Sequence, residues 1–327
     1  MESLVEEKIM IAGANGMVGN AIYRAFCELN IISFQKKILI PSRKELDLSN
    51  YKIVDEWFSN YKPNIVILAA AKVGGIYANN NYPADFLLEN LKIQTNLIEI
   101  SHKYKVKKLL FLGSSCVYPK HAKQPIIEEE LLEGKLEVTS EYYSIAKIAG
   151  IKLCESLKLQ YGLNAICLIP PNLFGPRDNY HPKNSHVLPS LIKKFSDAKE
   201  KNSDSVTCWG TGHQLREFMF VDDLADACLY ALENWDLNKK NAPKDKFGNS
   251  LSWLNVGSDI EISIKDLSNK IAELIGFKGK INWDENMPNG NLRKKLNSKR
   301  FQSLGWKPKT TLDEGLLKTI NDFRKNY

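Results

Sequence analysis

Short apolar runs alternate with longer amphipathic segments along the first half of the chain. The runs are typical of buried strands, and the segments between them have the spacing of helices. We expect strands at 8–12, 37–40, 65–70, 108–112 and 165–169. We expect helices at 16–27, 53–61 and 83–104, and one containing Tyr143 that runs to about residue 161. This alternation predicts the α/β class, with a doubly wound parallel sheet covered by helices on both faces.

The pattern changes after Pro170-Pro171. Loops rich in Pro, Asn, Gly and His follow, with helices expected at 187–199 and 221–233 and an exposed polar loop at 238–250. These features predict a boundary near residue 170. Residues 1–170 would form the first domain, and 171–327 mainly a second, smaller α/β domain that binds substrate and closes over the carboxyl edge of the sheet. The helix from about residue 221 is expected to pack back onto the first domain.

Composition narrows the class of protein. The chain has 327 residues, a net charge of +7 and no apolar run of about 18 residues, so we expect no membrane span. Its start has no apolar core typical of a signal peptide. The six cysteines are irregularly spaced with no Cys-x-x-Cys pair, which predicts no metal site and a reducing cytoplasm. Lys and Arg are spread without aromatic interleaving, so we expect anionic nucleotides rather than nucleic acid as ligands.

A glycine-rich segment directly follows the first expected strand and opens a helix. Three glycines spaced by three permit a tight turn, close approach to a pyrophosphate and close helix packing. The helix amino terminus adds N–H donors and partial positive charge. This context predicts a Rossmann-type dinucleotide site, formed by Gly13, Asn15, Gly16, Met17, Val18 and Gly19.

Arg43 follows the end of the second expected strand. An enzyme that uses NAD usually has an acid at that point to hold the ribose hydroxyls, whereas an arginine can bind a 2′-phosphate. The sequence there is Pro41-Ser42-Arg43, so NADPH is favoured over NADH. The alternative is a solvated arginine without a ligand.

Gly113-Ser114-Ser115-Cys116 follows the apolar run 108–112, about thirty residues before Tyr143 and Lys147. A strand that ends in this way places hydroxyls at the carboxyl edge of the sheet, where ligands bind. Tyr143 and Lys147 are four apart and share a helix face, and a nearby ammonium favours the phenolate. We therefore expect Ser114, Tyr143 and Lys147 to bind, protonate and reduce a carbonyl. The Cys116 thiol is not needed for reduction alone.

These residues together resemble the extended short-chain dehydrogenases/reductases, and longer blocks resemble the GDP-L-fucose synthase family within them. The blocks are 68–76, 113–120, 146–150, 184–189 and 209–212, with Arg216-Glu217-Phe218, Asn255-Val256-Gly257 and Leu304-Gly305-Trp306. Enzymes of this family epimerise carbons 3 and 5 of GDP-4-keto-6-deoxy-D-mannose and reduce carbon 4 with NADPH. The resemblance implies the same activity here, at a site without a metal.

The resemblance also implies roles for individual residues. Ser114, Tyr143 and Lys147 match the reductase triad, and Cys116 and His186 match the pair that epimerises. Cofactor contacts are implied for Arg43, Leu112, Gly113, Ser114, Ser115, Lys147, Pro170, Asn172, Leu173 and His186. Substrate contacts are implied for Lys194, Trp209, Arg216 and Asn289. A homodimer is implied, with the 83–104 and 141–161 helices of two subunits at the interface.

Several positions depart from the family pattern and leave alternatives open. Ser140 stands in place of an asparagine, Pro171 in place of a threonine and Asn289 in place of an aspartate. A second hypothesis is therefore a 4-reductase or epimerase/reductase of a related GDP-4-keto-6-deoxy sugar such as a heptose. A third is a dinucleotide-sensing protein without catalysis, although such a protein would not be expected to keep Ser114, Tyr143 and Lys147. Individually, Cys116 could be buried filler, His186 a helix cap, Trp209 core and Lys194 a solvated residue.

Overall fold

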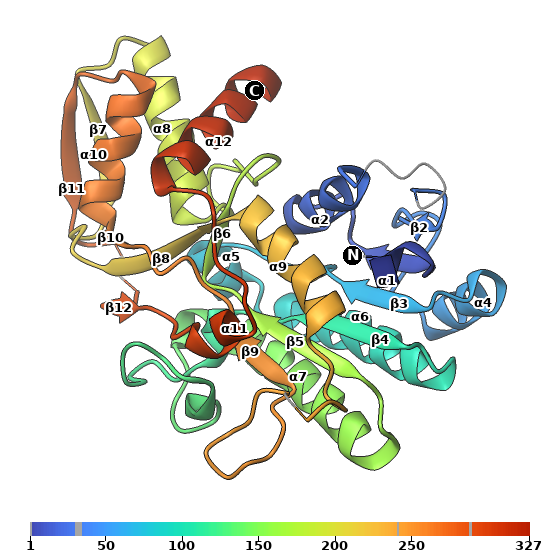
Figure 1. Ribbon diagram of the computed structural model, residues 1–327. Coiled ribbons are helices and arrows are strands. Elements are labelled where there is room, and N and C mark those ends of the chain that lie inside the picture. Colours follow the sequence, from blue (N-terminus) through green and yellow to red (C-terminus); the bar gives the residue numbers. More distant parts are fainter. Residues whose placement is uncertain (1, 30–34, 241, 288–289) are drawn as a thin grey trace.

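Six parallel strands form the main sheet, in the order β2-β1-β3-β4-β5-β9 (Figure 1). The structure is a computed structural model that describes residues 2–29, 35–240, 242–287 and 290–327. The strands are β1 (Ile9–Ala12), β2 (Ile38–Leu39), β3 (Ile65–Leu68), β4 (Lys108–Leu112), β5 (Ala165–Ile169) and β9 (Trp253–Asn255). Residues of the central strands β1, β3, β4 and β5 are fully buried, as expected of a sheet covered on both faces. The predicted parallel α/β sheet is confirmed.

Helices cover both faces of this sheet. On one face α2 (Met17–Cys27) packs against α9 (Val221–Asn234), with α1 (Glu2–Val5) beside α9. The other face carries α4 (Tyr51–Tyr61), α6 (Pro83–Lys103) and α7 (Glu141–Tyr161), while α5 (Ile76–Asn81) contacts α6. Arg24 on α2 pairs with Asp222 on α9 at 2.5 Å. Helix α9, which begins at residue 221, therefore packs against a helix of the first sheet.

Strand β9 was not expected from the sequence. Its three residues are buried and pair in parallel with β5, with Leu254 beside Leu168. The exposed loop predicted at 238–250 precedes it; residue 241 lies outside the described residues, and most of the others are exposed. Because both α9 and β9 return to the first sheet, the division at residue 170 is interrupted twice, and it stays a prediction.

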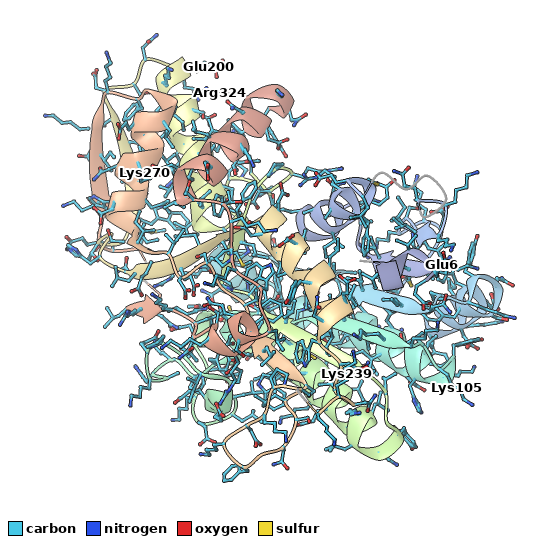
Figure 2. The ribbon with its side chains drawn as sticks, in the orientation of Figure 1. Glu6, Lys105, Glu200, Lys239, Lys270 and Arg324 are labelled. Carbon is cyan, nitrogen blue, oxygen red and sulfur yellow. The ribbon has the colours of Figure 1, made fainter. Side chains whose placement is uncertain are left out.

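The remaining elements form a second, smaller layer with its own hydrophobic core. Strands β10 (Glu261–Ser263), β8 (Leu215–Phe220) and β12 (Arg293–Lys294) form one sheet, to which β6 (Asn172–Phe174) is added beside β8. β7 (Ser205–Trp209) pairs with β11 (Lys280–Asp284). Helices α8 (Val187–Glu200), α10 (Ile264–Ile275) and α12 (Leu312–Asn326) belong to this layer, whereas α11 (Lys299–Ser303) packs against β9 of the main sheet. Charged side chains project from its outer surface (Figure 2), and Lys270 on α10 pairs with Asp313 on α12 at 2.7 Å.

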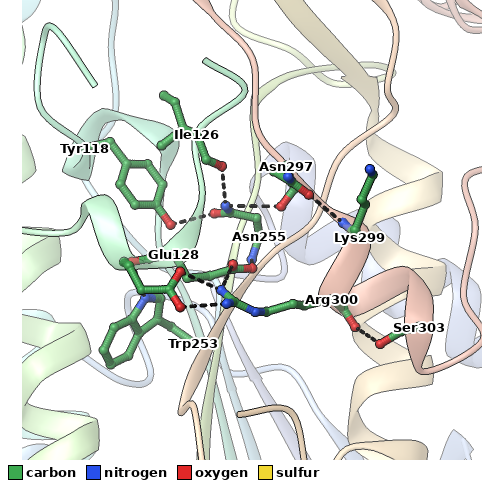
Figure 3. A network of polar contacts seen from close by, with 10 residues as sticks. Tyr118, Ile126, Glu128, Trp253, Asn255, Asn297, Lys299, Arg300 and Ser303 are labelled. Carbon is green, nitrogen blue, oxygen red and sulfur yellow. Dashed lines mark hydrogen bonds and ion pairs between the residues drawn. The ribbon is translucent and has the colours of Figure 1, made fainter. Parts of the chain in front are cut away.

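A buried polar network joins the segment after β4 to β9 and α11 (Figure 3). Tyr118 donates to the side-chain oxygen of Asn255 at 2.6 Å, and the Asn255 backbone N–H donates to Glu128 at 3.0 Å. Arg300 on α11 pairs with Glu128 and Glu129, each at 2.6 Å. The network holds the loop of residues 113–140, which includes the three short 3-10 turns η1 (Ser115–Val117), η2 (Glu128–Glu130) and η3 (Val138–Ser140), against the end of the sheet.

Replacing Arg300 by methionine should destabilise the fold strongly. The Glu128 side chain is 1% exposed, so its carboxylate would be left buried without a cation, which costs about 3–5 kcal/mol of unfolding free energy. Burial already raises the pKa of Glu128 despite its hydrogen bonds and Arg300. Stability from a raised carboxyl pKa is present at acid pH and lost as pH rises. The defect in urea unfolding should therefore be larger at neutral than at acid pH.

Lys299→Met is the matched control, because Lys299 is exposed and enters the network only through its backbone N–H. Equal unfolding midpoints for Arg300→Met and the parent would contradict the assignment.

Candidate functional site

The loop between β1 and α2 has the shape that the glycine spacing predicted. Gly13 has a positive φ of 89°, and a Cβ there would lie 2.7 Å from the backbone nitrogen of Ala70. A Cβ on Gly19 would lie 2.2 Å from the carbonyl oxygen of Gly13. Only glycine fits at these two positions, so the loop packs tightly between β1 and β3.

This loop lies where the strand order reverses, between β1 and β3. Ligands of open α/β sheets bind at such a switch point, beyond the carboxyl ends of the strands. Asn15 and Gly16 are exposed there, and Met17 and Val18 are half-buried at the start of α2. No side chain caps the helix amino terminus at Gly16. The uncapped amino terminus of α2 therefore suits the pyrophosphate of a dinucleotide.

Arg43 is exposed after the end of β2. Glu45, an acid that the sequence argument did not consider, folds back to accept from the Ser42 backbone N–H at 2.7 Å. Hydrogen bonds from Ser49, and then Arg43, hold the pKa of Asp47 below its usual range. Both nearby carboxylates thus have partners within their own loop, and Arg43 remains accessible to a phosphate.

Ser114, Tyr143 and Lys147 come together at the carboxyl end of β4. The Ser114 hydroxyl accepts from the Cys116 backbone N–H at 3.3 Å and hydrogen-bonds the Tyr143 phenol. Lys147, one helical turn beyond Tyr143 on α7, donates to the Leu112 carbonyl at 2.9 Å, and its Nζ lies 5.9 Å from the centre of the Tyr143 ring. The convergence expected of these three residues is therefore present.

The expected direction of the Tyr143 pKa is wrong for this structure. Burial raises the pKa of Tyr143, and the neighbouring Cys116 raises it further, against the hydrogen bond from Ser114. Burial also lowers the pKa of Lys147 to about 8. The lysine is held by a carbonyl oxygen rather than by the phenol, so desolvation outweighs the attraction that favours a phenolate. Tyr143 is thus held as a neutral proton donor.

Cys116 lies in a group of polar and cationic side chains. Its Sγ is 3.4 Å from the Nζ of Lys294 on β12. Burial raises the pKa of Cys116, but Lys294 and hydrogen bonds from Ser114 and Ser140 outweigh it, so the net shift is downward. This environment favours a thiolate, which a cysteine that only fills space would not need.

His186 is the N-cap residue of α8. Part of the residue is exposed to solvent. The protein around the imidazole removes much of its hydration, and this desolvation, together with the positive charge of Lys294, lowers the pKa of His186. The preceding segment is docked at the carboxyl end of β3, where the Gly75 N–H donates to the Asn184 carbonyl at 2.9 Å. The positive charge of Lys294 therefore acts on both Cys116 and His186.

Segments predicted to contact the cofactor are also adjacent. The Gly113 N–H donates to the Leu168 carbonyl at 2.8 Å, and the Ser115 N–H donates to the Pro170 carbonyl at 3.0 Å. These bonds bring Leu112, Gly113 and Ser115 beside Pro170, after which β6 carries Asn172 and Leu173 into the second sheet.

The predicted substrate residues lie in the second layer. Lys194 on α8 donates to the Thr207 carbonyl at 3.2 Å, and its ammonium is 5.2 Å from the ring centre of Trp209, which is 45% exposed on β7. The Arg216 guanidinium on β8 is close enough to Cys116 and Glu137 to interact electrostatically with both. Asn289 lies outside the described residues.

Within the described ranges no cluster of His, Cys, Asp and Glu could hold a metal ion. No helix in those ranges is long and apolar enough to cross a membrane.

Comparison with known proteins gives consistent matches. The model of the family described as "NAD dependent epimerase/dehydratase family" matches residues 9–243. The chain is 48% identical to GDP-L-fucose synthase 1 of Arabidopsis thaliana, covering 98% of this chain and 94% of the relative. It is 44% identical to GDP-L-fucose synthase of Escherichia coli (strain K12), covering 98% of both.

A solved structure, the GDP-mannoheptose C4 reductase MlghC of Campylobacter jejuni with NADP bound, is 36% identical with a TM-score of 0.84 and covers 98% of this chain and 99% of that one.

Proposed function

Since this chain belongs to the NAD dependent epimerase/dehydratase family, we propose that it is an NADPH-dependent 3,5-epimerase/4-reductase. Its substrate is GDP-4-keto-6-deoxy-D-mannose and its product is GDP-L-fucose. The identity of 48% with a plant GDP-L-fucose synthase over nearly the full length supports this substrate. The observation that carries the double activity is the position of the Cys116 thiol, which hydrogen-bonds the same Ser114 that contacts Tyr143.

Epimerisation uses the acidity that the 4-keto group gives to carbons 3 and 5. The Cys116 thiolate removes a proton from one face of the sugar ring, and His186 returns a proton to the other face. Its lowered pKa makes His186 a stronger acid whenever it carries a proton. Ser114 and Tyr143 stabilise the enolate oxygen that forms at carbon 4.

Reduction at carbon 4 uses the same pair of hydroxyls. Tyr143 donates a proton to the carbonyl oxygen, while Ser114 holds that oxygen in place. Bound NADPH supplies the hydride. Lys147 lies next to Tyr143 with a pKa lowered to about 8, so it can exchange protons near neutral pH.

Further residues would hold the two ligands. The 13–19 loop and Arg43 would hold the pyrophosphate and the 2′-phosphate of NADPH. Lys194 and Trp209 would hold the guanine end of the sugar nucleotide through charge and stacking, and Arg216 would face its diphosphate.

Replacing Arg43 by alanine should raise the KM for NADPH about tenfold or more and leave the KM for NADH nearly unchanged. The reason is the loss of a charged hydrogen bond to the 2′-phosphate, which is worth roughly 1.5–3 kcal/mol. Steady-state kinetics with both cofactors measures the effect, and Lys44→Ala on the same exposed turn is the control. Equal damage with NADH would contradict the role of Arg43.

The overall proposal is tested by incubating the protein with NADPH and GDP-4-keto-6-deoxy-D-mannose and identifying the product sugar by NMR. GDP-L-fucose is expected. A GDP-6-deoxyhexose with the original configuration at carbons 3 and 5 would contradict the epimerase part.

A second candidate is reduction of a related GDP-4-keto-6-deoxy sugar such as a heptose. Ser140 favours it, because this short side chain stands next to Cys116 where the family pattern has asparagine. The similarity to the Campylobacter jejuni heptose reductase gives further support. Faster turnover of the GDP-4-keto-6-deoxy-heptose than of the mannose derivative would favour this candidate.

The protein is further proposed to act in the cytoplasm as a homodimer. The paired helices α6 and α7 carry exposed apolar side chains, namely Leu88, Tyr142, Ile145, Leu159 and Tyr161. An apolar surface of this kind suits a four-helix interface between two subunits. A solution mass equal to that of one chain would contradict the dimer.

A further inference from the structure

Lys294 is the nearest cation to the Cys116 sulfur in the described part of the chain. No functional role for this lysine was expected from the sequence. It lies on β12, where it pairs with Arg216 of β8. Its Nζ is 3.4 Å from the Cys116 Sγ, although the two residues are 178 positions apart. The side chain is half-buried, so this is not a freely solvated lysine.

The backbone around Lys294 is fixed from both sides. The Leu296 N–H donates to the buried carboxylate of Glu217 at 2.8 Å, and the Lys295 N–H donates to Gln124 at 2.8 Å. The Ile126 N–H in turn donates to the Lys295 carbonyl at 2.8 Å. Strand β12, which is bound to the second sheet and to the 113–140 loop, therefore holds the Lys294 ammonium group next to the Cys116 sulfur.

The groups that act on the Cys116 sulfur come from several elements. Lys294 and Arg216 supply positive charge from β12 and β8, while Ser114 and Ser140 supply hydrogen bonds. Tyr143 from α7 is held neutral beside it. Lys294 also acts electrostatically on His186, and Glu137 acts on Arg216.

We propose that Lys294 is a positioning residue for epimerisation, whose ammonium group holds the Cys116 sulfur as a thiolate and aims it at the substrate. The inference rests on the proposed function only in the effect of this pair on catalysis, which is the removal of protons from carbons 3 and 5. The contact between Lys294 and Cys116 itself is present without any substrate. An opposite charge at this distance commonly lowers a pKa by about one to three units.

Alkylation of Cys116 by iodoacetamide tests the pair directly, since only the thiolate reacts. The Cys27→Ser background removes the one other cysteine of the six that is not fully buried. The alkylation rate of the peptide that contains Cys116 is followed by mass spectrometry from about pH 5 to about pH 10. In Lys294→Met the midpoint should move to higher pH by at least about one unit. Lys294→Arg, which keeps the charge, should largely restore it.

Arg293→Met is the matched control. Arg293 is a neighbouring cation on the same strand, but it is exposed and paired with Glu261 at 2.7 Å. Its loss should leave the midpoint in place. A shift of the same size in both variants would show a general charge effect and overturn the proposal.

Deuterium exchange at carbons 3 and 5 of the substrate connects the pair to the reaction. In Lys294→Met the exchange rate should fall about tenfold or more near neutral pH and recover as the pH is raised. A loss that does not recover at high pH, or an unshifted alkylation profile with a raised KM, would overturn the proposal in favour of substrate binding by Lys294. If the alkylation midpoint shifts but the parent protein does not exchange deuterium, the proposed function fails while the pair stands.

Discussion

Replacement of Cys116 by serine is expected to stop epimerisation while leaving reduction at carbon 4 possible. Serine keeps the size and polarity of the side chain, but its hydroxyl cannot ionise near neutral pH beside Lys294 as a thiol can. Ser114, Tyr143 and Lys147 keep their positions, because none of them is held by the Cys116 sulfur alone. Exchange of solvent deuterium into carbons 3 and 5 should fall by at least about two orders of magnitude.

The product of this variant identifies which step was lost. It should slowly form a GDP-6-deoxyhexose that keeps the original configuration at carbons 3 and 5. Cys27→Ser, at the end of α2, is the control and should exchange normally. Exchange at the parent rate in Cys116→Ser would mean that the cysteine only packs and that another base acts. His186→Asn should also impair epimerisation, through loss of the second proton-transfer group.

The largest effect on reduction should come from Tyr143→Phe. The phenol is buried and is the acid in contact with Ser114, so its removal should lower turnover by at least about two orders of magnitude. The ring still packs against Phe86, with ring centres 6.4 Å apart, so the fold should be kept. Single-turnover oxidation of NADPH measures the loss, and cofactor binding should be unchanged.

Tyr142→Phe provides the matched control on the preceding residue. Tyr142 is 45% exposed, so its phenol should contribute little to turnover. If Tyr142→Phe proved as damaging as Tyr143→Phe, the assignment of the acid would be wrong.

The sequence predicted the main sheet well because its strands are short, continuous apolar runs followed by polar residues. It did not predict β9, since three buried residues after a long exposed loop carry too little pattern to mark a strand. It also predicted that Ser114, Tyr143 and Lys147 would meet, because helix spacing and the end of a strand are local features. The strands of the main sheet and the spacing of Tyr143 and Lys147 are set by residues that are close in sequence.

Two features of the site, the Tyr143 pKa and the position of Lys294, could not be predicted from local sequence patterns. The direction of the Tyr143 pKa depends on how much solvent the fold removes, and burial and Cys116 raise this pKa despite the hydrogen bond with Ser114. Lys294 belongs to a run of basic residues that looks solvated, and only the pairing of β12 with β8 brings it to Cys116. The available signal was a basic residue five positions after Asn289, for which the resemblance implies a substrate contact.

The route of the chain also sets the order in which a ribosome can complete the molecule. By the time residue 255 has been synthesised, every strand of the main sheet exists, and domains generally fold as they emerge. Cys116 would still lack its ammonium partner, and the buried Glu128 would still lack Arg300. A nascent chain of that length is therefore expected to have a cofactor site before it has a finished epimerisation site. The thiol chemistry would become available only after residue 294 has also emerged from the ribosome.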